Sequence, residues 1–202
     1  SSFGLTALHR ARTPAVVRAL VEFGVPVDVP GLRRETPLHT CCDAPLVVEA
    51  LLEVNADVGA RALGGSTPLH WAVVADNIDS ARLMLDYGAE VNDANDSGNT
   101  ALHLASSRRM CELLIERGAR VSVENAKGQI PLETAAERRG EPEFASIAEY
   151  LLDVSHERGL RFRAAATSSS SRGLGLPPSS APSSRRLAPR QQASAASVSS
   201  AA

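Results

Sequence analysis

Histidines recur at nearly regular intervals in this chain, and imidazole is a common zinc ligand. They are His9, His39, His70 and His103. Ligands of one zinc ion must each lie within about 2.1 Å of it, whereas helices packed side by side are about 8 to 10 Å apart. Histidines in successive helical units therefore cannot share an ion, and we predict no metal site. We interpret each as a buried side chain that hydrogen-bonds the threonine three residues before it and the neighbouring backbone.

Three cysteines could supply a nucleophile if a base lay beside one of them. Cys41 and Cys42 are adjacent and Cys111 stands apart, which fits no disulfide framework and no CxxC metal pair. Cys111 also shares an apolar helical stripe with Leu114 and Ile115. We interpret all three as reduced core residues, which favours an intracellular, cytoplasmic location with the nucleus as the alternative.

Other chemistries find little support in the sequence. The stretch GLGLPP at 173–178 lacks the lysine and the following helix of a phosphate-binding loop. We therefore predict no enzyme and no cofactor. The longest apolar stretches, such as Pro45 to Val48, fall far short of the ~20 residues that span a bilayer, so we expect no membrane insertion.

Charge is distributed unevenly along the 202 residues. Residues 155–202 carry seven Arg and one Glu, a net charge of +6, which leaves −8 on the residues before them. An acidic body repels phosphates, so we expect no nucleic acid partner. The segment from residue 159 to 202 is rich in Ser, Ala, Pro and Arg, and it is predicted to be disordered because it offers little apolar surface to bury.

A short motif appears five times and is the main clue to the fold. The copies are LTALHRA (5–11), ETPLHTC (35–41), STPLHWA (66–72), NTALHLA (99–105) and QIPLETA (129–135). They follow one another at steps of 30, 31, 33 and 30 residues. Each is followed by a second stretch with apolar residues at helical spacing, so each unit is predicted to be a helix, a turn and a helix.

Capping residues mark where these helices begin and end. The first helices are expected to start at an N-cap threonine, in two cases with proline next: Thr36 with Pro37, Thr67 with Pro68, and Thr100. The second helices are expected to end at Gly24, Asn55, Gly88 and Gly118. The extended connections that follow reach turn glycines at Gly65, Gly98 and Gly128, and Arg34 breaks that rule.

The combination of TPLH, a small residue and a second helix ending in GAEVN (88–92) resembles the ankyrin repeat. The resemblance covers residues 3 to about 154. It implies an all-α solenoid of about five helix-turn-helix repeats with hairpin connections. The expected boundaries are 1–30 for a first repeat truncated at its N-terminal side, then 31–61, 62–94, 95–124 and 125–158, with the disordered tail at 159–202. The first repeat has nothing polar ahead of it, so we expect the sequence to be part of a longer chain.

The distance from the capping threonine to the end of the second helix varies between repeats. It is 21 residues in repeat three, 19 in repeat two and 18 in repeats one and four. The missing residues fall between the motif and the second helix. We therefore expect clipped first helices in repeats one, two and four and full-length ones in repeats three and five, which makes the exposed face of the first helices uneven.

The family resemblance implies protein binding by the hairpin tips and the concave face, without catalysis. We expect a monomer that binds an unidentified protein partner. The alternative is the regulatory or substrate-docking portion of a larger enzyme or of a ubiquitin-ligase adaptor. The expected contact residues are Leu32, Arg33, Glu35, Leu63, Ser66, Trp71, Val74, Asp96, Ser97, Asn99, Lys127 and Gln129.

Two of the singled-out residues have competing interpretations. Burial between repeats is favoured for Trp71, the only tryptophan, and partial exposure on the concave face is the alternative. Asn92, in LDYGAEVN (85–92), resembles the family's site of enzymatic asparagine hydroxylation in hosts that have the relevant oxygenase. An unmodified polar hairpin residue is the favoured interpretation of Asn92.

Overall fold

The computed structural model describes residues 5–137 and 142–157. The tail prediction, from residue 159 onward, lies outside the described residues. Every regular element in the described ranges is helical, and the one β-type contact is an isolated bridge between Ala94 and Thr100. The prediction of an all-α repeat fold is confirmed.

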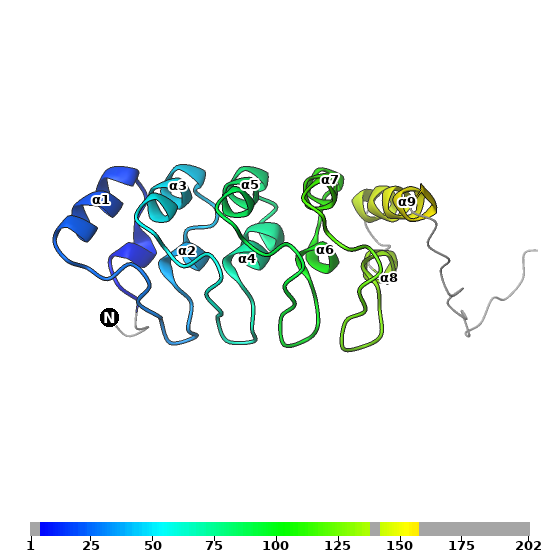
Figure 1. Ribbon diagram of the computed structural model, residues 1–202, viewed down its shortest axis with the longest axis horizontal. Helices are drawn as coiled ribbons and strands as arrows, with labels where there is room; N and C mark the ends of the chain where they lie inside the picture. The colour runs from blue at the N-terminus through cyan, green and yellow to red at the C-terminus, as the bar shows by residue number, and fades with distance from the viewer. Residues whose placement is uncertain (1–4, 138–141, 158–202) are drawn as a thin grey trace, which may run out of the picture. The chain divides into compact units, whose positions relative to one another are not determined.

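The helices form two layers (Figure 1). The first helices of the repeats are η1 Leu8–Arg10, α2 Pro37–Thr40, α4 Pro68–Val74, α6 Ala101–Leu104 and α8 Pro131–Glu137. The second helices are α1 Pro14–Glu22, α3 Pro45–Glu53, α5 Ile78–Asp86, α7 Arg108–Glu116 and α9 Pro142–Glu157. Each contacts the next helix in its own layer, so the repeats stack side by side. The connecting loops project on the side of the first helices.

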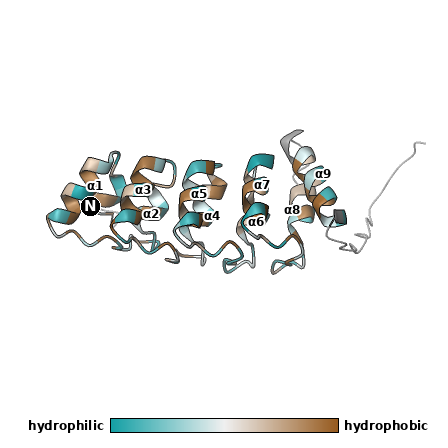
Figure 2. Ribbon diagram, turned by 45° about the horizontal axis from the view of Figure 1, so that its top comes forward, coloured by the Kyte–Doolittle hydropathy of each residue, from teal (hydrophilic) through white to brown (hydrophobic). Residues whose placement is uncertain are grey.

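The core lies between the two layers and is built mainly from aliphatic side chains. Leu38, Leu51, Leu69, Met84 and Leu114 are fully buried there. Each helix carries both hydrophobic and hydrophilic residues (Figure 2), as expected for helices that bury only one side. Burying such a side chain stabilises the fold by about 1.5–3 kcal/mol, and the apolar face of one repeat is covered only by its neighbours.

Local signals in the sequence place the helix ends correctly. Thr36 and Thr67 cap α2 and α4, with Pro37 and Pro68 in the first turn. Asn55 follows α3 with a φ of 63°, in the left-handed region that the glycines after the other second helices adopt. The capping pattern is therefore sufficient to position these helices along the chain.

The turn at Arg34 adopts the conformation of the glycines at the same position in other repeats. Its φ is 59°, against 71° at Gly65 and 72° at Gly98. At Gly98 an added Cβ would lie 2.6 Å from the backbone nitrogen of Ala126, so only glycine fits there. Arg34 shows that the turn itself tolerates a side chain.

The lengths of the first helices differ as expected from the spacing of the motif. η1 has three residues and α2 and α6 have four, whereas α4 and α8 have seven. Thr13 caps α1 only three residues after η1 ends, and its hydroxyl accepts the N–H of Val16 at 3.4 Å. The face formed by the first helices is therefore uneven, with α4 extending beyond its two neighbours.

Candidate functional site

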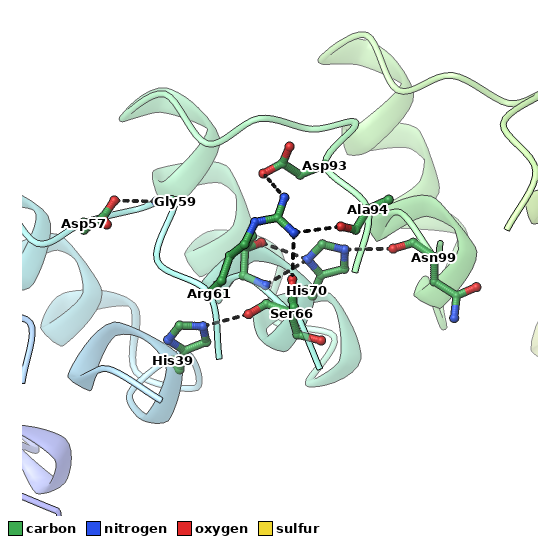
Figure 3. Close-up of polar contacts among 11 residues, drawn as sticks. His39, Asp57, Gly59, Arg61, Ser66, His70, Asp93, Ala94 and Asn99 are labelled. Atoms are coloured by element: carbon green, nitrogen blue, oxygen red, sulfur yellow. Dashed lines mark hydrogen bonds and ion pairs between the residues drawn. The ribbon is translucent and has the colours of Figure 1, made fainter. Parts of the chain in front are cut away.

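Each motif histidine joins its own repeat to the next one. His39 Nδ1 accepts the backbone N–H of Thr36 at 3.1 Å, which leaves Nε2 protonated to donate to the carbonyl of Ser66 at 3.1 Å. His70 does the same with Thr67 N and Asn99 O, each at 3.1 Å (Figure 3). His9 reaches the carbonyl of Glu35, and His103 that of Gln129, each at 3.0 Å.

Both ring nitrogens of these histidines are therefore occupied by hydrogen bonds inside the protein. Burial lowers the pKa of His39, His70 and His103, because a charged imidazole loses its hydration there. Within residues 5–137 and 142–157 the structure contains no group of three His, Cys, Asp or Glu side chains that could hold a metal ion. The interpretation of the histidines as structural hydrogen-bonding residues is confirmed.

The cysteines are packed into the core as expected. Cys41, Cys42 and Cys111 are all buried and unbonded to one another. Burial raises the pKa of the Cys42 thiol to about 11 and that of Cys111 to about 12. These thiols stay protonated at neutral pH and are poor nucleophiles.

The loops that project beside the first helices end in four similar tips, which we define as residues 31–35, 62–66, 95–99 and 125–129. In each tip the first residue donates its N–H to the carbonyl of the last, at distances of 2.8 to 3.0 Å. The histidine of the preceding repeat donates to the same carbonyl. The imidazoles therefore hold the tips in place as well as joining the repeats.

Backbone hydrogen bonds also run from tip to tip. Leu63 N–H donates to Arg33 O at 2.6 Å, Asp96 N–H to Gly64 O at 3.0 Å, and Ala126 N–H to Ser97 O at 2.9 Å. The four tips therefore form one continuous row. A partner would meet this row as a fixed surface, with little ordering cost on this side of the interface.

Arg61 adds a side-chain contact between repeats two and three that our sequence analysis missed. Its guanidinium donates to Ala94 O at 3.0 Å and to Gly65 O at 3.3 Å, and it lies 3.3 Å from the carboxylate of Asp93 (Figure 3). The sequence does contain one indication of this contact, because Arg61 and Asp93 carry opposite charges and are 32 residues apart, close to the repeat step. That spacing alone does not distinguish a contact from two solvated charges.

The expected contact residues fall into two groups by exposure. Leu32 is 70% exposed, Leu63 71% and Val74 64%. The polar residues that are exposed are Arg33, Asp96, Ser97 and Lys127, and those that are half-buried are Ser66, Asn99 and Gln129. Large apolar side chains are thus exposed to solvent beside polar ones along the tips and α4.

A hollow of about 410 Å³ lies where α4 extends past its shorter neighbours. It is lined by Cys42, Ser66, His70, Trp71, Val74, Ala75 and Leu104. Trp71 is half-buried, which lies between the expected burial between repeats and the alternative of exposure on the concave face. Its ring packs edge to face against His39, with ring centroids 5.5 Å apart. The hollow exists because α2 ends at Thr40 and α6 at Leu104, so neither reaches the end of α4.

Comparison with known proteins agrees with this architecture. Residues 44–125 match the family model for ankyrin repeats in three copies. Residues 44–125 are ankyrin repeats. It is similar to mouse diacylglycerol kinase iota, with 38% identity over 85 residues, and to chicken inversin, with 33% identity over 84 residues. These matches cover 39% and 40% of the chain but only 8% of the length of either relative.

One expected contact residue of the ankyrin stack is not available to a partner. Glu35 is only 8% exposed, and its carboxylate folds back within the tip to accept the N–H of Arg33 at 2.7 Å. It packs against Gly31, where there is no side chain to displace it. Glu35 therefore offers little surface to a partner, and its carboxylate stabilises the tip instead.

Asn92 also has a role within the ankyrin stack. Its side chain is half-buried, and Nδ2 donates to Gly118 O at 3.1 Å while Oδ1 accepts the N–H of Arg120 at 2.8 Å. The amide therefore ties repeat three to repeat four.

No helix in the described parts of the chain is long and apolar enough to cross a bilayer.

Proposed function

We propose that this ankyrin stack is a protein-interaction module. The partner contacts the tips and the exposed face of the first helices, through Leu32, Arg33, Leu63, Ser66, Trp71, Val74, Asp96, Ser97, Asn99, Lys127 and Gln129. The observation that carries the proposal is the apolar exposure of Leu32, Leu63 and Val74 on a row of tips held by backbone hydrogen bonds. Apolar side chains grouped with polar ones on a fixed surface are typical of interaction sites.

Catalysis is not part of the proposal. The buried thiols are protonated, and the motif histidines already donate to backbone carbonyls, so neither can act as nucleophile or base without breaking the fold. The protonated, unpaired cysteines also support a reducing, intracellular location, cytoplasmic or nuclear. We further infer that the stack acts as a monomer.

A second candidate function rests on the length of the relatives. Because the matched relatives are much longer than this chain, the stack would serve as the regulatory or substrate-docking portion of a larger enzyme or ubiquitin-ligase adaptor. The same surface would then select the partner or substrate. Sequencing the complete transcript tests this candidate, which requires a catalytic or adaptor segment in the same reading frame.

The first prediction tests the binding surface. Leu63→Ala and Arg33→Glu are expected to weaken capture of partners from a lysate of the native host. Both side chains are exposed, so the melting midpoint should change little. The matched control is Arg82→Glu, which makes the same charge reversal at an exposed position on α5, in the other layer.

Normal capture by both variants, together with loss of capture in Arg82→Glu, would move the binding site to the layer of second helices. Loss in Leu63→Ala and Arg33→Glu alone supports the proposed surface. Quantitative mass spectrometry of the captured proteins measures the difference for each partner separately.

The second prediction concerns Asn92. We propose it as a candidate for hydroxylation by an oxygenase that uses O2 in a eukaryotic host, which would require the hydrogen bonds of Asn92 to Gly118 and Arg120 to open. Because two hydrogen bonds hold the side-chain amide, we expect peptide mass spectrometry of protein from the native host to show mainly unmodified Asn92, and the mass of one added oxygen there would identify it as a hydroxylation site. Native protein that carries only unmodified asparagine at this position would leave the hydrogen bonds to Gly118 and Arg120 as its sole role.

A further inference from the structure

The apolar hollow beside α4 has a basic surface on its N-terminal side. Arg33 and Arg34 are exposed on the tip that precedes α2, and Arg10, the last residue of η1, and Arg12, just after it, are also exposed. None of the four forms an ion pair within 4.0 Å of another described residue. Their guanidinium groups are therefore available to the carboxylates of a ligand.

The charges nearest to these arginines do not cancel them. Arg10 and Arg12 line a second hollow, of about 440 Å³, together with Asp43. Asp43 is thus the one acidic residue in this lining, against two arginines, and the Glu35 carboxylate already accepts the backbone N–H of Arg33. Arg61, by contrast, is already paired with Asp93 and contributes little free charge.

The sign of the surface reverses on the other side of the hollow. Glu90 and Asp96 are exposed on the segment that leads to α6, and that segment carries no Lys or Arg. A carboxylate-bearing ligand would be attracted toward the arginines of repeats one and two and repelled from the acidic segment that leads to α6. The surface therefore favours one direction for a bound chain.

We propose that the ligand of this surface is an extended acidic peptide segment with one bulky apolar side chain. The apolar side chain occupies the hollow lined by Trp71, Val74 and Leu104. Carboxylates on one side of it pair with Arg33 and Arg34, and more distant ones with Arg10 and Arg12. This inference rests on the proposed function and specifies the chemistry of the partner.

The repeat spacing sets where the acidic residues must lie. The tip that carries Arg33 is hydrogen-bonded to the next tip, which precedes α4, so it is one repeat away from the hollow. Neighbouring helices are about 8 to 10 Å apart, and an extended chain advances about 3.3 Å per residue. The carboxylates should therefore lie about three residues from the apolar side chain for Arg33 and Arg34, and about six for Arg10 and Arg12.

Trp71 provides a direct readout, since it is the only tryptophan and it lines the hollow. The probes are a series of short Ser/Gly peptides without tryptophan. Each peptide has one leucine and one block of glutamates, and the number of residues between the leucine and the block increases along the series, on either side of the leucine. Added to the full chain, they should shift Trp71 emission most strongly at separations of about three to six residues. Peptides with lysine in place of glutamate should bind at least about tenfold more weakly.

Variants test separately the contribution of the arginines and of the apolar hollow to the change in Trp71 emission. Arg33→Glu and Arg12→Glu should each weaken the acidic peptide several-fold, whereas Arg82→Glu, with the same change in charge, should not. Val74→Gln should weaken the leucine peptide and leave a leucine-free peptide unaffected. Equal binding of lysine and glutamate peptides, or no emission change with any peptide, would overturn the proposal.

Other occupants would give different results. Emission that depends on protein concentration would assign the hollow to a second copy of the chain. Emission that changes with Arg185→Glu and Arg186→Glu in the full chain would assign it to the tail. Either result overturns the peptide assignment, while loss of partner capture in Leu63→Ala would still support the proposed function.

Discussion

A single imidazole performs several tasks in each of the first four repeats of this protein. His70 accepts the N–H of Thr67 at the start of α4 and donates to the last carbonyl of the next tip. It therefore caps its own helix, joins two repeats and holds one tip of the row in place. The fifth repeat shows what the position requires, because Glu133 there accepts the N–H of Ile130 but has no proton to donate when it is ionised.

The third prediction is that His70→Ala destabilises the stack. The change leaves the N–H of Thr67 and one acceptor site on Asn99 O without this partner, which should lower the free energy of unfolding by about 1–3 kcal/mol. Urea titration of the two proteins measures the loss. A metal chelator should leave the wild-type midpoint unchanged, and a midpoint that falls on chelation would instead indicate a metal site.

Sequence reasoning worked best for residues whose role depends on local geometry. The capping threonines and histidines act within a few positions of one another, so the motif alone indicates their contacts. Glu35 and Trp71 depend on their surroundings in three dimensions. A glutamate in a tip gives no sign that its carboxylate folds over Gly31, and the exposure of Trp71 is set by where the neighbouring helices end.

At the scale of elements, the second helices are joined through the residues that follow them. The carboxylate of Asp28 accepts the N–H of Asp57 at 3.1 Å, and the amide of Asn92 accepts that of Arg120 at 2.8 Å. Gly59 holds the equivalent position in repeat two and has no side chain for this contact. The lengths of the helices could be predicted by counting residues, whereas these side-chain contacts needed the packed structure.

The fourth prediction is that Gly59→Asn stabilises the stack. An added Cβ would meet only Asp57 Oδ1 at 3.5 Å, an ordinary contact, and the backbone φ of Gly59 is not in the left-handed region. The new amide can form the contact that Asn92 makes, and the unfolded chain loses freedom, so we expect a gain of about 0.5–1.5 kcal/mol. Gly59→Ala is the control, since it restricts the chain without adding the hydrogen bond and should gain less.

For the stack as a whole, stability depends on contacts between neighbours. Each repeat is joined to the next by buried apolar side chains, one histidine and one tip-to-tip hydrogen bond across most of the row. A change that weakens the same contact at several interfaces therefore acts on the entire stack. Because three of the histidines are buried with lowered pKa values, protons can make such a change.

The fifth prediction is that the stack loses stability as the pH falls below about 6.5, the ordinary pKa of histidine. In the folded state burial lowers the pKa of His39, His70 and His103, so below that pH the unfolded chain binds more protons. Stability is therefore fully present above pH 6.5 and is lost as the pH falls toward the lowered values. Each histidine contributes at most about 1.4 kcal/mol per pH unit.

Denaturant midpoints between pH 7.5 and 5.5 measure this dependence, and the range lies above the ordinary titration of carboxylates. His103→Gln should lower stability at pH 7.5 and also reduce the pH dependence, because one of the three contributing groups is removed. His156→Gln is the matched control, since the side chain of His156 is exposed at the end of α9. A midpoint that stays constant over the range, or equal effects of the two substitutions, would mean that the buried imidazoles do not couple the stack to pH.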